Sequence, residues 1–226
     1  MNNGEVFKKS RECIDELQAI GLKQIKVLKE ISDENSEDKV AEYRYQQVKY
    51  FWKDWDALKK IYDLQLNQHL PTRTMFDESV RVLYLSKIPV EKADDIVRKD
   101  FLKIIKLLYS RAKDSEVRKR YLDFWNHYVG SLKINIHDKR IISFPDMPSL
   151  LKKLFTDYEQ LYSLFSIYSE EVHANALRAY MPPSNSVFGI IRRLSLELTK
   201  DMVNFMKDKE GMIKEIDMIL DKYSTD

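Results

Sequence analysis

Glycine, proline and cysteine are scarce in this sequence of 226 residues. Five glycines and six prolines are too few for a chain of short β-strands, which needs a turn about every eight to twelve residues. The single cysteine, Cys13, excludes an intrachain disulfide and a thiolate metal cage, and is typical of a reducing compartment. The composition therefore favours an all-α protein.

Long hydrophobic runs are also missing. No apolar stretch approaches the roughly 18 residues that a membrane-spanning helix needs, and residues 1–10 lack the apolar run of a signal peptide. We therefore expect a cytoplasmic protein that makes no membrane contact. A net charge of +2 gives no general attraction to nucleic acid or anionic lipid, although residues 98–120 are locally basic.

Apolar residues recur at helical intervals through most of the chain. Near the amino terminus Ile14, Leu17, Gly21, Ile25 and Leu28 follow one another at steps of three or four, which places them on one helix face. The same pattern predicts helices over eight ranges of the sequence. These are residues 4–31, 40–66, 72–87, 94–112, 115–132, 150–176, 187–206 and 212–223.

The predicted helices form one domain over residues 1–226, an antiparallel bundle of about seven to eight helices. Pro71 and Pro89 mark breaks, because a proline removes a backbone donor, and Thr72 is expected to cap the helix that follows. The longest segment without a helical period, 133–148, is expected to pack across the bundle or to help form a site. The domain has three parts: a helical hairpin over 4–67, a bundle core over 71–176 and carboxyl-terminal helices over 184–223.

Aromatic and polar residues share one stripe of the predicted helix 150–176. Its members follow at steps of three or four and are Tyr158, Tyr162, Phe165, Ser169 and His173. A neutral imidazole is suited to acid–base work, because its unperturbed pKa is about 6.5. A core histidine hydrogen-bonded to a carboxylate or a backbone group gives the same pattern. His173 is therefore a candidate catalytic or ligand-binding residue, with a structural role as the alternative.

Glu170 and His173 form a Glu-x-x-His pair, the unit that holds metal in di-iron helical bundles. A site of that kind needs a second such pair, and no other histidine in the sequence follows a glutamate by three positions. We therefore expect no metal. Because a glycine-rich phosphate loop and a Gly-x-Ser-x-Gly elbow are also missing, no cofactor is expected.

Charged residues open the predicted third helix. Arg73 and Asp77 are four residues apart and can pair on one helix face, and Glu78 comes next. A buried arginine needs carboxylates around it, because an unpaired buried charge is costly. If this helix packs beside Ser169 and His173, the five residues form a polar cluster among apolar helices. We interpret the cluster as a ligand site, with a structural network that sets helix register as the alternative.

Arg120 and His127 are seven residues apart, close to two helical turns, so both project from one side of a helix. This spacing resembles that of HEPN domains, small helical ribonucleases in which paired protomers cleave RNA. Those motifs carry a polar residue after the arginine, where this chain has Tyr121. The resemblance implies metal-independent RNA cleavage by Arg120 and His127 in a dimer.

Aromatic residues concentrate between residues 43 and 55, beside Arg44 and Lys49. Such a concentration can stack on nucleic-acid bases. At helical spacing it can equally form packed core and boundary positions. Both interpretations stay open at this point.

Three segments combine an arginine followed by an acidic helix, an Arg-Tyr-Leu stretch, and a tyrosine-rich helix that ends in Ser-x-x-Val-His. They are Pro71–Val80, Arg120–Phe124 and Tyr162–His173. Together they resemble a family of helical, mainly bacterial proteins catalogued as domain of unknown function 5677. The step Phe76-Asp77-Glu78 leaves open which acid occupies the family position. Since that family has no settled activity, the resemblance implies a fold and a cluster of Arg73, Glu78 and His173, and no reaction.

The sequence predicts a binding or regulatory module with one polar pocket, acting in phage defence or stress. One alternative is an enzyme, either a ribonuclease that uses Arg120 and His127 or an acid–base catalyst that uses His173. Another is a structural protein that dimerises through its first two helices. The partner is not specified, and a homodimer and a nucleic acid are both compatible with the sequence. The residues that bound the predicted pocket are Arg73, Asp77, Glu78, Ser169 and His173.

Overall fold

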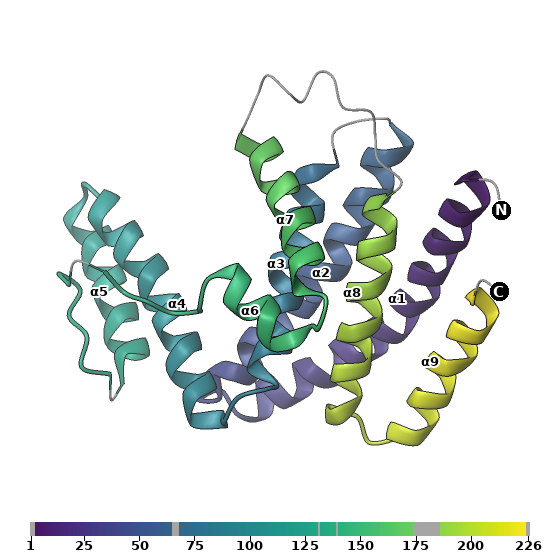
Figure 1. Cartoon of the computed structure of the whole chain (residues 1–226). Helices are drawn as coiled ribbons and strands as arrows, with labels where there is room; N and C mark the ends of the chain where they lie inside the picture. Colours follow the sequence, from purple (N-terminus) through teal and green to yellow (C-terminus); the bar gives the residue numbers. More distant parts are fainter. Residues whose placement is uncertain (1–2, 65–67, 131, 139, 174–185, 225–226) are drawn as a thin grey trace.

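The computed structural model describes residues 3–64, 68–130, 132–138, 140–173 and 186–224, with residues 3, 4, 69, 167–173 and 186 described by their helical backbone alone. The described chain contains nine α-helices and no β-strand, which confirms the all-α class. Within these ranges no helix combines the length and the apolar character that a bilayer crossing requires. The helices are α1 (Asn3–Glu34), α2 (Lys39–Asp63), α3 (His69–Leu85), α4 (Val90–Arg111), α5 (Ser115–Val129), α6 (Met147–Leu154), α7 (Tyr158–His173), α8 (Ser186–Met202) and α9 (Lys209–Tyr223), with a 3-10 turn, η2 (Val203–Phe205), after α8 (Figure 1).

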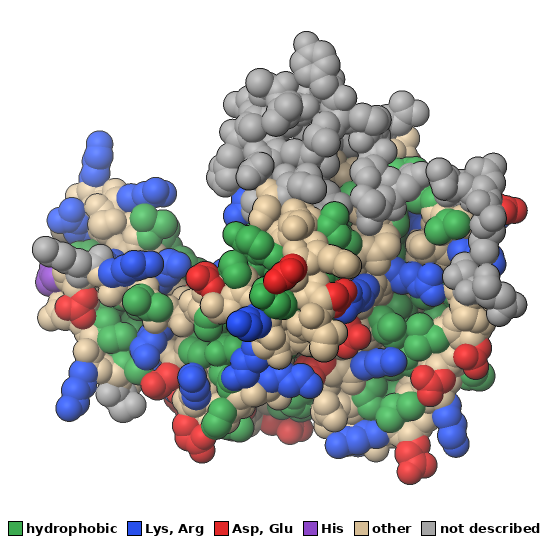
Figure 2. Space-filling model, in the orientation of Figure 1, with side chains coloured by type: hydrophobic (Ala, Val, Ile, Leu, Met, Phe, Trp, Pro, Cys, Tyr) green, Lys and Arg blue, Asp and Glu red, His purple; other side chains and the backbone are tan. Residues whose placement is uncertain are grey.

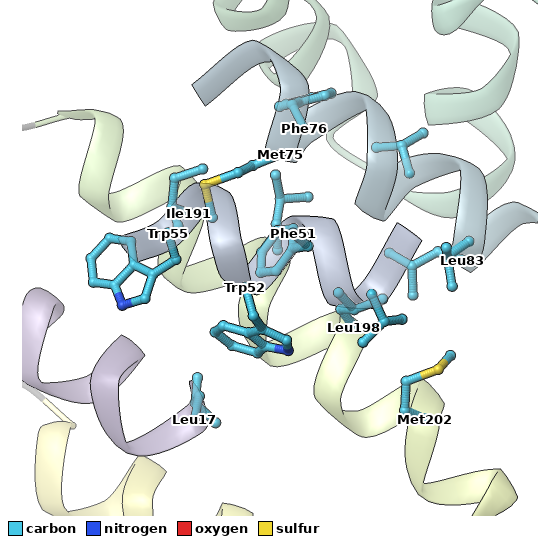
Figure 3. Close-up of a cluster of buried hydrophobic side chains, with 14 of the residues drawn as sticks. Leu17, Phe51, Trp52, Trp55, Met75, Phe76, Leu83, Ile191, Leu198 and Met202 are labelled. Carbon is cyan, nitrogen blue, oxygen red and sulfur yellow. The ribbon is translucent and has the colours of Figure 1, made fainter. Parts of the chain in front are cut away.

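The main hydrophobic core lies between α1, α2, α3 and α8. The middle of α2 supplies three rings, Phe51, Trp52 and Trp55, which are at most 1% exposed. Figure 3 shows these rings converging with apolar side chains of the other three helices. Each fully buried ring of this size stabilises the fold by roughly 1.5–3 kcal/mol relative to exposure. The aromatic concentration in α2 is therefore mainly core, since Tyr43 is buried as well.

Helix α1 approaches α2 closely because position 21 carries no side chain. A Cβ atom built on Gly21 would lie 2.1 Å from Nε1 of Trp52. The indole of Trp52 therefore lies directly against the backbone of α1. One turn before the glycine, Leu17 is fully buried as well.

Helices α4 and α5 have a small core of their own, which they share with described residues of the segment between α5 and α6. In Figure 1 these two helices lie at the far side of the molecule from α9. We call residues 98–144 the basic lobe. Its buried apolar residues are Leu102, Ile105, Trp125, Ile136 and Ile141.

Four predicted helix starts are wrong, because α3, α4, α6 and α9 begin three or four residues earlier than expected, at His69, Val90, Met147 and Lys209. Helix α3 begins at His69 rather than at Thr72, because Pro71 lies in the first turn, where a helix needs no backbone donor. The Thr72 hydroxyl donates to the Gln68 carbonyl at 2.8 Å and does not cap the helix. Helix α4 begins at Val90 rather than at Asp94, directly after Pro89 in the capping position.

The helix predicted over residues 150–176 is divided in two. Helix α6 ends at Leu154, and Phe155 adopts an extended backbone with φ −134° and ψ 138° before α7 begins at Tyr158. Asp157, in the turn, forms an ion pair with Arg193 of α8, in which Nη2 and Oδ1 are 2.7 Å apart. Phe155 is buried. Because contacts with distant residues produce this break, periodicity does not predict it. The predicted end of this helix, 174–176, lies outside the described residues.

We expect Gly21→Ala to lower the free energy of unfolding by about 1–3 kcal/mol, because the added methyl group overpacks the contact with Trp52. This loss opposes the helix propensity of alanine, which by itself favours the variant by about 1 kcal/mol. Urea denaturation of the wild type and the variant measures the difference.

Gly189→Ala is the matched control for this substitution. Gly189 lies inside α8, and a Cβ atom there would meet nothing within 4 Å. The control is expected to be as stable as the wild type or slightly more stable. A gain of stability in both alanine variants would show that Trp52 does not lie against the backbone at Gly21.

Candidate functional site

Arg73 lies where α3 meets α7. Its guanidinium carbon is 5.7 Å from the ring centroid of Phe165, at the edge of the packing between the two helices. Phe165 also packs against Phe76 of α3, with ring centroids 5.2 Å apart. The structure thus brings the helix of Arg73 and the helix of the predicted aromatic stripe together.

Asp77 forms an ion pair with Arg81, one turn further along α3, with 3.0 Å between Nε and Oδ2. Arg81 also reaches Asp100 of α4, with 3.3 Å between Nη1 and Oδ2. Asp100 accepts a hydrogen bond of 2.8 Å from the hydroxyl of Ser143. This network holds α3, α4 and the segment before α6 in register. Burial lowers the pKa of Arg81, but Asp77, Tyr43 and Asp100 together outweigh burial and raise it.

Glu78 belongs to a different environment, because consecutive helical residues point about 100° apart. The residue is 9% exposed, and its Oε2 atom has no hydrogen-bond partner in the described part of the chain. Burial, followed by the charges of Asp54 on α2 and of Asp77, raises the pKa of Glu78 to about 8. At neutral pH this carboxyl group therefore carries its proton in most molecules.

The side chains of Ser169 and His173 lie outside the described residues, as does that of Glu170. The backbone of α7 is helical to His173 and packs along α3, so the two helices that carry the predicted pocket are neighbours. Among the members that are described, Arg73 contacts α7, Asp77 pairs with Arg81, and Glu78 faces Asp54. Within the same described residues, no group of three potential metal ligands converges.

Arg120 and His127 are both exposed on α5, in the basic lobe and away from Arg73. The His127 ring packs edge to face against Tyr128, with centroids 5.1 Å apart. His127 also lines an open groove of about 500 Å³ between α5 and the turn that joins α1 to α2. Arg120 does not line that groove.

A second groove, of about 400 Å³, lies between α4 and the segment 140–144. Among the described residues, three cations line it, Lys103, Lys106 and Arg140, and no carboxylate does. None of the three forms an ion pair with a described residue, and Figure 2 shows lysine and arginine side chains gathered over this lobe. We call this hollow the basic groove. Its other lining residues are Leu107, Ser110, Ile141, Ile142, Ser143 and Phe144.

Sequence reasoning identified the local excess of charge in the basic lobe but did not select the residues of the basic groove. Lys103 and Lys106 are three positions apart and share a helix face, which is a detectable signal. Arg140 comes from the segment without helical period, which was expected to pack across the bundle or to help form a site. Only the folded chain brings it beside α4.

No family model matches this chain, and no curated protein or solved structure is significantly similar to it. The resemblances to domain of unknown function 5677 and to HEPN domains therefore stay predictions.

We expect the stability of the wild type to fall as the pH rises from 4.5 to about 8, because the folded state holds a proton on Glu78 that the unfolded state releases. Each pH unit in this window costs about 1.4 kcal/mol. Glu78→Gln removes the titration, so the variant should match the wild type near pH 4.5 and exceed its stability at about pH 9. Urea denaturation at both pH values measures this.

Glu30→Gln, at an exposed position of α1, makes the same chemical change without burial. Its stability should follow the wild type at both pH values. A Glu78→Gln protein that is less stable than the wild type at the higher pH would show that Glu78 is ionised and paired in the folded state.

Proposed function

We propose that this single-domain helical bundle protein is a binding module that takes up single-stranded RNA on its basic lobe. The observation that supports this most is the basic groove, in which Lys103, Lys106 and Arg140 face one hollow without a carboxylate among them. Cations that no described residue pairs with are available to phosphates.

The distribution of charge supports the same proposal. Residues 98–144 contain 12 lysines and arginines against 5 aspartates and glutamates, a net charge of +7. The whole chain carries +2, so the remainder carries −5. A positive potential concentrated on one lobe steers a polyanion to that lobe and away from the bundle.

The apolar residues of the basic lobe favour single-stranded RNA over a ligand that offers only phosphate groups. Leu107 and Phe144 line the basic groove beside the lysines, and Ile142 is 66% exposed at its edge. Unstacked bases offer flat apolar faces next to each phosphate, so they match this alternation of cation and hydrocarbon. The concave shape also fits a strand better than a flat membrane surface.

We expect replacement of Lys103 and Lys106 by glutamine to weaken RNA binding and to reduce its salt dependence. The slope of log K against log salt should fall by roughly 1.4, about 0.7 for each phosphate that the variant no longer neutralises. Fluorescence anisotropy of a labelled polyuridylate oligonucleotide at about 50 to 300 mM salt measures the slope.

Replacement of Lys207 and Lys214 by glutamine is the control, because both are exposed and lie outside the lobe. This control removes equal charge and should keep the wild-type slope. Equal slopes for the two double variants would contradict the proposal. Binding to phosphatidylserine vesicles without binding to RNA would contradict it as well.

A ribonuclease is the second candidate function, since Arg120 and His127 are exposed on the lobe that would hold the RNA. Their Cα atoms are separated by about 10 Å along α5, so a shared phosphate calls for the paired arrangement of two protomers. We expect His127→Ala to lower RNA cleavage in the presence of a chelator by about 100-fold or more, with little change in RNA affinity. His137→Ala is the control, as that histidine is exposed on the same lobe. Equal cleavage by both variants would exclude His127.

The polar pocket around Arg73 and His173 also stays a proposal, supported by the packing of α3 along α7. Experimental coordinates in which the imidazole lies far from the guanidinium would contradict it. Dimerisation through α1 and α2 is less supported, because α1 packs against α2, α8 and α9 and α2 packs against α3 and α4 within one chain.

A further inference from the structure

A third pocket, of about 470 Å³, lies between the start of α2, the turn that joins α3 to α4, and η2. Its walls are mainly apolar and include Val40, Ile88, Val90 and Phe205. Of the residues that the structure describes, one cation lines it, Arg44. The pocket is separate from the basic groove and shares no lining residue with it.

Arg44 has no anionic partner within the described chain. Its Nε atom is enclosed and has no hydrogen-bond partner, and its guanidinium lies within 4 Å of no described carboxylate. The guanidinium carbon is 4.8 Å from the ring centroid of Phe205, so one face of the group is covered by hydrocarbon. A guanidinium in such surroundings is costly unless an anion approaches it.

The two nearest acids are engaged elsewhere. Asp201 accepts a hydrogen bond of 2.6 Å from the Ser86 hydroxyl, and burial raises its pKa. Asp38 accepts the backbone N–H groups of Val40 and Ala41 as the cap of α2, at 3.0 and 2.9 Å. Burial lowers the pKa of Arg44, and the charges of Asp201 and Asp38 offset this effect only in part. A further negative charge beside Arg44 would therefore be stabilised.

We infer that this pocket binds a small carboxylate with an apolar body. The carboxylate would accept hydrogen bonds from the Nη groups of Arg44, which are not enclosed as Nε is, and the apolar body would pack against Val90 and Phe205. A singly charged ligand fits better than a phosphate, because there is one cation and Asp38 also lines the pocket. This site is independent of RNA binding by the basic lobe.

Benzoate is the probe for this site, and the Nε–Hε resonance of Arg44 is the readout. The resonance is assigned by its loss in Arg44→Met. Benzoate should shift it with saturation in the millimolar range, whereas benzyl alcohol, a neutral molecule of similar shape, should not. An unchanged resonance at about 50 mM benzoate, far above a dissociation constant of about 1 mM, would overturn the inference, and so would an equal shift with benzyl alcohol.

Variants separate ligand binding from a structural role of Arg44. Arg44→Met keeps a flexible apolar side chain over Phe205 and removes the charge, so it should bind benzoate at least tenfold more weakly by calorimetry. Arg118→Met, at an exposed position of α5, removes the same charge elsewhere and should bind as the wild type does. Equal benzoate affinities in the two variants would overturn the inference. If Arg44→Met fails to fold, Arg44→Lys supplies the assignment, since lysine has no Nε–Hε group, and the benzoate titration of the wild type decides.

Discussion

The contact between Gly21 and Trp52 sets how the other helices are arranged. Because no side chain separates the indole from the backbone of α1, Trp55 on the next turn of α2 reaches both neighbours. Its Nε1 atom donates to Asp15 of α1 at 2.9 Å, and its ring meets Phe188 of α8 with centroids 5.7 Å apart. The buried Nε1 of Trp52 has no partner among the described residues, which costs about 1–3 kcal/mol. The packing of three buried rings exceeds that cost, since truncating one such ring typically costs about 3–5 kcal/mol.

Adjacent acidic side chains of α3, which packs against α2, point toward different neighbours. Asp77 turns toward Arg81 and Asp100, where ion pairs link two helices, whereas Glu78 turns toward α2 and Asp54, where no described cation pairs with it. Of these two adjacent acids, one therefore lies beside a cation and the other beside carboxylates. Asp77 forms an ion pair within this network, whereas burial and negative neighbours raise the pKa of Glu78.

The surroundings of the cations also differ from one part of the fold to another. On the bundle, several are matched by carboxylates, such as Arg11 with Asp63 and Lys23 with Glu215. In the basic groove they face a common hollow without such partners, and in the third pocket Arg44 stands with apolar walls around it. Exposed and clustered cations suit a polyanion with many weak contacts, whereas one half-buried cation suits a single small anion.

The sequence by itself determined the helical class, most of the helix positions and the local excess of charge, because these depend on spacing and composition along the chain. It also placed Arg73 and the aromatic stripe on helices that the structure brings together. It did not determine the break at Phe155, the partner of Asp77, or the meeting of Arg140 with Lys103 and Lys106. Each of these depends on residues far apart in the chain, whose distances are decided only when side chains such as the Trp52 indole fill the space between helices.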